Sequence, residues 1–143
     1  MIDSIDYKRW FERAEQDTKV LEYIINEGVE GVEDTFCYLC QQAAEKYIKG
    51  FLLFQNQIIP KTHDLVFLLK KVLPFDSSLE DLFDDFSVLN EYSVSARYPS
   101  DFEDRRTVKD AYEAFESLLR IKNTLEKLIN WFECFRFFWY NNF

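Results

Sequence analysis

Residues 36–54 read FCYLCQQAAEKYIKGFLLF, and this run indicates the fold class. Its apolar residues recur every three or four positions, the spacing that places side chains on one face of an α-helix. That face consists of Phe36, Cys40, Ala43, Ala44, Tyr47, Phe51 and Phe54. The small pair Ala43-Ala44 leaves room for a second helix to approach closely. The run therefore predicts a long helix packed against other helices.

The same periodicity appears in four other parts of the chain. A helix is expected from about residue 7 to 26, ending near Gly28 and Gly31. Two shorter helices are expected after residues 62 and 77, and a last one from about residue 108 to 131. No run shows the sustained alternation of a strand. Short connections favour antiparallel neighbours, so the sequence predicts an all-α, up-and-down bundle of four to five helices.

Polar residues at the expected helix starts predict how the helices begin. Asp34 is expected to cap the helix over 36–54, and Thr62 the helix that follows it. Thr107 and Asp110 have the spacing of a capping box, in which each side chain accepts from the other's backbone amide. We expect this box to open the last helix.

The C-terminal stretch differs from the rest of the chain. Residues 131–143, WFECFRFFWYNNF, place aromatic rings on every side of a helix, so no single face can bury them all. One interpretation is a helical extension folded against the bundle, and the other is a contact with a second copy or a partner. We therefore divide the chain into a bundle over 1–130 and an aromatic C-terminal extension over 131–143.

Composition limits the classes of function. The net charge of −9 disfavours broad nucleic-acid binding, because that binding relies on Lys and Arg neutralising phosphates. A small basic site for one phosphate group remains compatible with it. No apolar run is long enough for a membrane span, the first residues do not resemble a secretion signal, and three cysteines are an odd number. We expect a cytoplasmic protein without a membrane contact.

Cys37 and Cys40 have the spacing of a zinc or redox motif. A zinc site needs two more ligands, and only Cys134 and His63 remain to supply them. A thioredoxin-type motif needs a preceding strand, and none is indicated here. We expect both cysteines to be buried in the helix, and we expect no metal and no cofactor.

Three short blocks together resemble the HEPN family, the higher eukaryotes and prokaryotes nucleotide-binding domain. They are residues 40–49 (CQQAAEKYIK), 62–65 (THDL) and 97–99 (RYP). The resemblance covers roughly residues 5–130 and implies a bundle of four or five helices that is usually a homodimer. It also implies a minimal nucleotidyltransferase partner, in pairs that can behave as toxin and antitoxin. In some such pairs the partner modifies a tyrosine, for which Tyr98 is the candidate here.

Many HEPN proteins are metal-independent ribonucleases with an Arg followed, four to six residues later, by a His. This chain has one histidine, His63, and the nearest preceding arginine is Arg13. Since RNA cleavage needs a base and a charge stabiliser held together, we expect a non-catalytic module rather than an enzyme. Two alternatives are a ribonuclease in which His63 and Arg97 meet in space, and a purely structural interaction domain.

Four basic residues form the predicted ligand site: Lys46, Lys49, His63 and Arg97. The two lysines lie three residues apart, on adjacent turns of one helix. His63 is expected at a helix start, where free amides favour anions, and Arg97 can contact a phosphate with two hydrogen bonds. If the bundle brings the four together, they predict a site for a nucleotide phosphate or RNA.

A structural interpretation of the same residues competes with the ligand site. In it, Glu45, Lys46 and Arg97 form ion pairs that hold the bundle together, with Asp64 and Asp101 as further partners. The two interpretations differ in whether the basic side chains are already paired within the chain.

Overall fold

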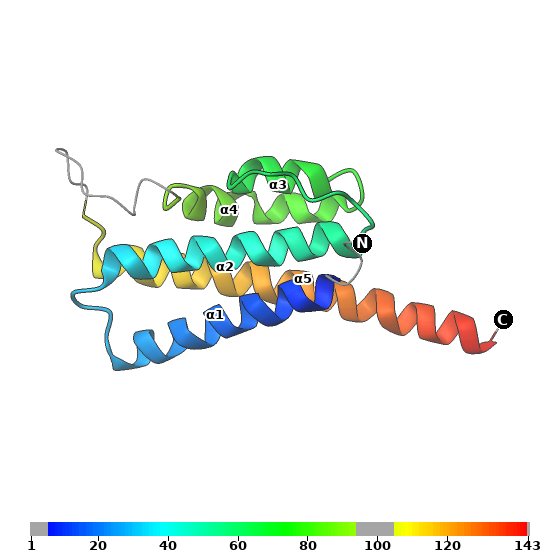
Figure 1. Ribbon diagram of the computed structural model, residues 1–143, viewed down its shortest axis with the longest axis horizontal. Helices are drawn as coiled ribbons and strands as arrows, with labels where there is room; N and C mark the ends of the chain where they lie inside the picture. Colours follow the sequence, from blue (N-terminus) through cyan, green and yellow to red (C-terminus); the bar gives the residue numbers. More distant parts are fainter. Residues whose placement is uncertain (1–5, 94–104, 143) are drawn as a thin grey trace.

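Three long helices form the frame of the molecule in this computed structural model, which describes residues 6–93 and 105–142. They are α1 (Tyr7–Glu27), α2 (Glu33–Phe54) and α5 (Val108–Asn142). α2 packs against both of the others, and α1 runs opposite to α2 and α5 (Figure 1). Its central position agrees with the apolar face predicted for residues 36–54.

Three short helices cover the side of α2 that faces away from α1 (Figure 1). They are α3 (Leu65–Val72), the 3₁₀-helix η2 (Ser77–Leu82) and α4 (Phe83–Asn90), and α4 also packs on α5. The described residues contain five α-helices and no strand, which confirms the predicted all-α fold class. None of these helices combines the length and the apolarity that crossing a membrane requires.

The connection between α2 and α3 returns along α2 without forming a helix. α2 ends at Phe54, yet Gln41, in its first half, donates from Nε2 to the backbone oxygen of His63 at 3.1 Å. Residues 55–64 therefore supply a non-helical return leg in the bundle. This path brings His63 beside α2, although 22 residues separate it from Gln41.

Small residues set the approach of α1 to α2. Ala43 and Ala44 are fully buried, as their position in the predicted apolar face suggested. Gly50 adds a second close contact, because a Cβ there would lie 2.9 Å from atoms of both Phe11 and Trp10. An alanine at position 50 would therefore push the two helices apart, since backbone and rings would have to shift together.

Two of the predicted caps are wrong. α3 is capped by Asp64, which accepts from the amides of Val66 and Phe67, while Thr62 Oγ1 accepts from the amide of Asp64 itself. His63 consequently precedes the helix rather than lying in its first turn. At α2, Asp34 lies inside the helix, and the N-cap residue makes no side-chain hydrogen bond.

Asp34 and the Thr107–Asp110 pair both bind backbone amides at or just before the start of α5. Asp34 Oδ1 accepts from the amide of Arg106 at 2.8 Å, so it joins the start of α2 to the segment before α5. The capping box is confirmed: Thr107 N donates to Asp110 Oδ2 at 2.8 Å, and Asp110 N donates to Thr107 Oγ1 at 3.1 Å. The start of α5 is therefore fixed by its own residues.

α5 continues well beyond the predicted end near residue 131. It runs unbroken to Asn142, and its last part projects away from the other helices (Figure 1). Of the two interpretations of this extension, folding against the bundle is wrong, because Phe135, Phe137 and Phe138 are all more than half exposed. Its base touches the bundle, where the Phe132 ring lies 6.1 Å from the Phe54 ring. The division predicted between residues 130 and 131 thus falls inside one helix.

Candidate functional site

A buried carboxylate on α2 organises the candidate site. Glu45 is only 7% exposed, and its Oε2 accepts from Lys49 Nζ at 3.0 Å. Its other oxygen, Oε1, lies 2.9 Å from His63 Nδ1. Because residues four apart lie on the same helix face, α2 aligns Glu45 with Lys49, and the return leg adds His63 from outside the helix.

Gln41 holds the return leg in place. It is fully buried, one turn before Glu45, and its Nε2 donates to the backbone oxygen of His63. The same amide lies 3.4 Å from Glu45 Oε1. Both contacts position the imidazole over α2, so the orientation of His63 depends on two buried polar groups.

The charges of this cluster nearly cancel. Lys49 is as buried as Glu45, and a buried ion pair of this kind leaves no net charge when His63 is neutral. The His63 side chain is 60% exposed, so the imidazole is the part of this cluster that solvent can reach.

The structure divides the four residues of the predicted site. Lys49 and His63 share one carboxylate, whereas Lys46 pairs with Asp17 of α1, with 2.5 Å between Nζ and Oδ2. Arg97, with the neighbouring Tyr98, lies outside the described residues.

Within the described residues, the competing structural interpretation is correct that Glu45 and Lys46 are paired and wrong about Asp64 as a partner. Glu45 and Lys46 are both in ion pairs, but Asp64 is a helix cap that also accepts from Asn90 Nδ2 at 3.1 Å. Asp101 lies outside the described part of the chain.

Two residues of this cluster, Gln41 and Glu45, were not among the predicted ligand residues. The spacing of Glu45 and Lys49 is a signal in the sequence, because Glu four residues before Lys is a favourable helix pair. No comparable signal links Glu45 to His63, since that contact depends on the path of the return leg.

A second polar cluster joins α1 to α5. Lys122 Nζ lies 2.9 Å from Glu126 and 3.2 Å from Glu15. Burial and a hydrogen bond to Glu15 raise the pKa of Glu126, whereas burial opposes the net lowering of the Glu15 pKa that Glu126 and Lys122 produce. The pKa values of the two carboxyl groups are therefore shifted in opposite directions.

Cys37 and Cys40 are buried in the core, as expected. Burial, followed by the charge of Asp110, raises the pKa of the Cys37 thiol to about 12. Burial likewise raises the pKa of Cys40. Both thiols stay protonated and act as small apolar groups.

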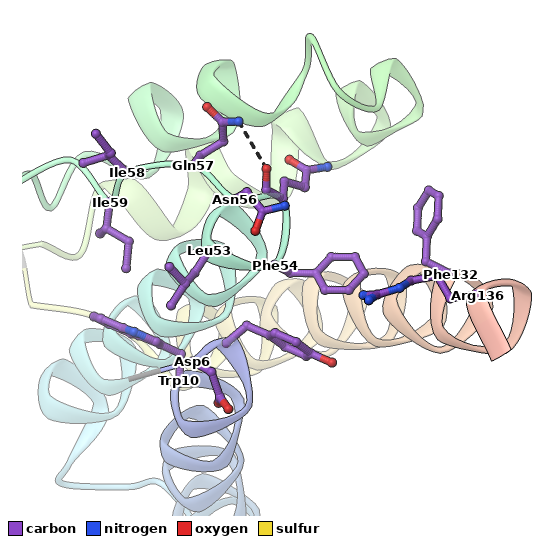
Figure 2. Close-up of a pocket in the computed structure, with 12 residues that line it drawn as sticks. Asp6, Trp10, Leu53, Phe54, Asn56, Gln57, Ile58, Ile59, Phe132 and Arg136 are labelled. Carbon is purple, nitrogen blue, oxygen red and sulfur yellow. Dashed lines mark hydrogen bonds between the residues drawn. The ribbon is translucent and has the colours of Figure 1, made fainter. Parts of the chain in front are cut away.

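A cleft of about 1030 Å³ lies where α2 ends, beside the start of α1 and the base of the extension. Figure 2 shows Trp10, Phe54, Phe132 and Arg136 around it, with Ile58 on the opposite side. Two buried polar atoms of its lining residues, Nε1 of Trp10 and Oε1 of a glutamine at position 55, have no hydrogen-bond partner in the described structure. The cleft is mainly apolar and separate from the Glu45 cluster.

Comparisons with known proteins agree with this architecture. The family model of the HEPN domain matches residues 7–128. The crystal structure of an archaeal HEPN homologue is similar, with a TM-score of 0.69 and 26% identity over 87% of this chain and 98% of that one. A crystal structure from Thermus thermophilus has the same TM-score and 29% identity, covering 85% and 96%. A comparison with curated proteins gives no match. The chain belongs to the HEPN domain family.

Proposed function

We propose that this HEPN domain is a non-catalytic partner module of a minimal nucleotidyltransferase, in a pair of the toxin–antitoxin type, and that it binds a nucleotide phosphate beside Lys49 and His63. The observation that carries the proposal is the placement of the chain's one histidine on the Glu45–Lys49 pair, with no arginine at the spacing that family ribonucleases use. Lys46 and Arg97 belong to the proposed site on the sequence argument alone.

Glu45 makes the nucleotide site testable, because a carboxylate beside the ligand weakens anion binding. Glu45→Gln removes one negative charge at nearly constant shape, so it should tighten binding of ATP at neutral pH. His63→Ala should weaken binding, because it removes the exposed imidazole that can donate to a phosphate oxygen. Isothermal titration with ATP measures both, and Lys127→Met, an exposed lysine on α5, is the control. ATP affinity that is the same in all four proteins would contradict the site.

The partnership has its own experiment. The chain is incubated with ATP and a minimal nucleotidyltransferase from the same organism, and its intact mass is measured. A mass increase of one nucleotidyl group that Tyr98→Phe abolishes supports the partnership and the acceptor residue. If the same mass increase is seen with Tyr98→Phe, the acceptor is a residue other than Tyr98. An unchanged mass together with no complex on size exclusion contradicts the partnership.

One observation favours a second function, a ribonuclease with a displaced active site. A histidine whose Nδ1 contacts a carboxylate presents Nε2 as a base, and His63 is held in this way by Glu45 with its ring largely exposed. Arg97 would then be the charge stabiliser. RNA cleavage that is lost in both His63→Ala and Arg97→Ala would establish this activity, and cleavage indifferent to both would assign it to a contaminant.

A further inference from the structure

The extension, residues 131–142 of α5, exposes more aromatic surface than a monomer ordinarily carries. Seven rings there are between 36% and 83% exposed: Trp131, Phe132, Phe135, Phe137, Phe138, Trp139 and Tyr140. At roughly 200 Å² per aromatic side chain, they present on the order of 800 Å². The largest apolar patch on a typical monomer is about 300–600 Å². One partner in a standard interface contributes about 800 Å², so the exposed rings, summed over all sides of the helix, amount to the share of one partner.

The spacing of three of these rings, Phe132, Phe135 and Trp139, indicates that another helix covers one face of the extension. Inside the bundle, α5 packs through a seam of residues alternately three and four apart, and this seam continues without a break into the extension. Its positions are Leu118, Ile121, Leu125, Leu128, Phe132, Phe135 and Trp139. The first three are fully buried, whereas the last two are more than half exposed. α1 begins at Tyr7 and α2 ends at Phe54, so neither helix follows the seam beyond Phe132.

Charge favours a second copy of this chain as the source of that helix. The extension carries one acid, Glu133, and one base, Arg136, so two extensions can meet without bringing like charges together. The remainder of the chain holds the net charge of −9. The extension is about 18 Å long, and it would separate two acidic bundles by more than the Debye length of about 8 Å at physiological salt. Lipid surfaces fit less well, because interfacial helices carry a face rich in Lys and Arg.

The cleft at the base of the extension supplies the other half of a self-complementary surface. It is lined by rings from three helices and by Ile58, which is 92% exposed. When two extensions lie antiparallel, the tip of each reaches the base of the other, where the cleft lies. The two polar atoms without a hydrogen-bond partner, on Trp10 and on the glutamine that follows α2, belong to residues lining the same cleft. Buried polar groups are ordinarily hydrogen-bonded, so these two mark a place where a second molecule can bind.

We propose that residues 131–142 pair antiparallel with the same residues of a second copy, and that the tip of each extension fills the cleft at the base of the other. The contact is isologous, so each copy provides one helix and one cleft, and the assembly closes as a dimer. It requires neither nucleotide nor transferase, and its test is therefore separate from the tests of the proposed function.

The first experiment measures molecular mass by sedimentation equilibrium. The full chain should be a dimer. Phe135→Asp, in the seam, and Ile58→Asp, at the cleft, should each weaken self-association by at least about 10-fold without changing the helical circular dichroism. Phe75→Asp is the matched control, because Phe75 is also about half exposed but lies in the turn after α3. A monomer at all concentrations, or a dimer that tolerates both substitutions, overturns the proposal.

The second experiment tests the orientation of the two copies. In a Cys134→Ser background, a chain carrying Ile58→Cys is mixed with a chain carrying Tyr140→Cys and oxidised. Disulfide cross-links should form between the two different chains, because an antiparallel pair places tip against cleft. Tyr140→Cys chains that cross-link mainly to one another would indicate parallel pairing and overturn the proposal. The proposal would also be overturned if the chain were monomeric and bound phosphatidylcholine vesicles through its extension.

Discussion

The inner and outer parts of α5 belong to one uninterrupted helix, but the inner part packs in the core and the outer part is exposed to solvent. The inner part, residues 108–130, buries Leu118, Ile121 and Leu125 and carries charged residues on its other faces. The outer part, residues 131–142, has a single acid and a single base and leaves its rings exposed. A helix therefore forms wherever local hydrogen bonds and spacing permit, while burial depends on what the rest of the molecule places beside it.

The largest expected contrast is in cysteine reactivity. Cys37 faces the core beside the inner part of α5, and at a pKa of about 12 roughly one molecule in 10,000 carries the reactive thiolate at pH 8. Cys134 is exposed on the outer part. Iodoacetamide should therefore modify Cys134 rapidly in the folded chain and leave Cys37 and Cys40 unmodified, as measured by peptide mass spectrometry. Equal labelling of all three without denaturant would show that the core opens readily.

The next contrast is in stability. Leu125→Ala should lower the free energy of unfolding by about 2–5 kcal/mol, because it leaves a cavity at a fully buried position. Phe137→Ala should change it by less than about 0.5 kcal/mol, because this ring is 73% exposed and lies away from the seam. Urea denaturation followed by circular dichroism measures both. Similar losses in the two variants would mean that the extension is part of the cooperative core.

A smaller effect is expected at the start of α5. Thr107→Ala removes the hydroxyl that accepts from the amide of Asp110, which should cost about 1 kcal/mol in urea denaturation. Thr35→Ala, an exposed position in the first turn of α2, is the matched control and should be near neutral. If both substitutions cost the same, the capping box contributes no more than an ordinary exposed threonine.

The smallest effect concerns pH. The raised pKa of Glu126 means that its contribution to stability is present below the unfolded value near 4.5 and is lost as pH rises through the folded pKa. Glu15, with a lowered pKa, contributes above that value and loses its contribution as pH falls. Glu126→Gln removes the first, while Lys122 still lowers the pKa of Glu15, so the variant should be less stable relative to the parent at pH 4 than at pH 7. Thermal melts at both values measure this, and the opposite order would contradict the assigned shifts.

Local signals in the sequence predicted part of the fold with good accuracy. The apolar spacing of residues 36–54 identified α2, and Thr107 with Asp110 identified the start of α5, because both depend on neighbours within one or two turns. Thr62 failed as a cap because Asp64, two residues later, satisfies the first amides of α3. Asp34 failed because its carboxylate binds an amide from a distant segment.

The candidate site was predictable only in its composition. Lys49 and His63 were selected for their chemistry, but the carboxylate between them and the amide that orients the return leg were not. Lys46, one turn away from Lys49, pairs with a different helix. The part of the site that includes Arg97 remains a prediction from the sequence.

By itself the sequence determined the helices, the capping box of α5, the buried cysteines and the family, because each follows from residues close together along the chain. Only the tertiary structure decided that His63 meets Glu45, that Lys46 turns to Asp17 and that α5 continues beyond its neighbours. The physical reason is that helical contacts repeat every three to four residues and can be read along the chain. Contacts between helices depend on how the connections run and where each partner helix ends.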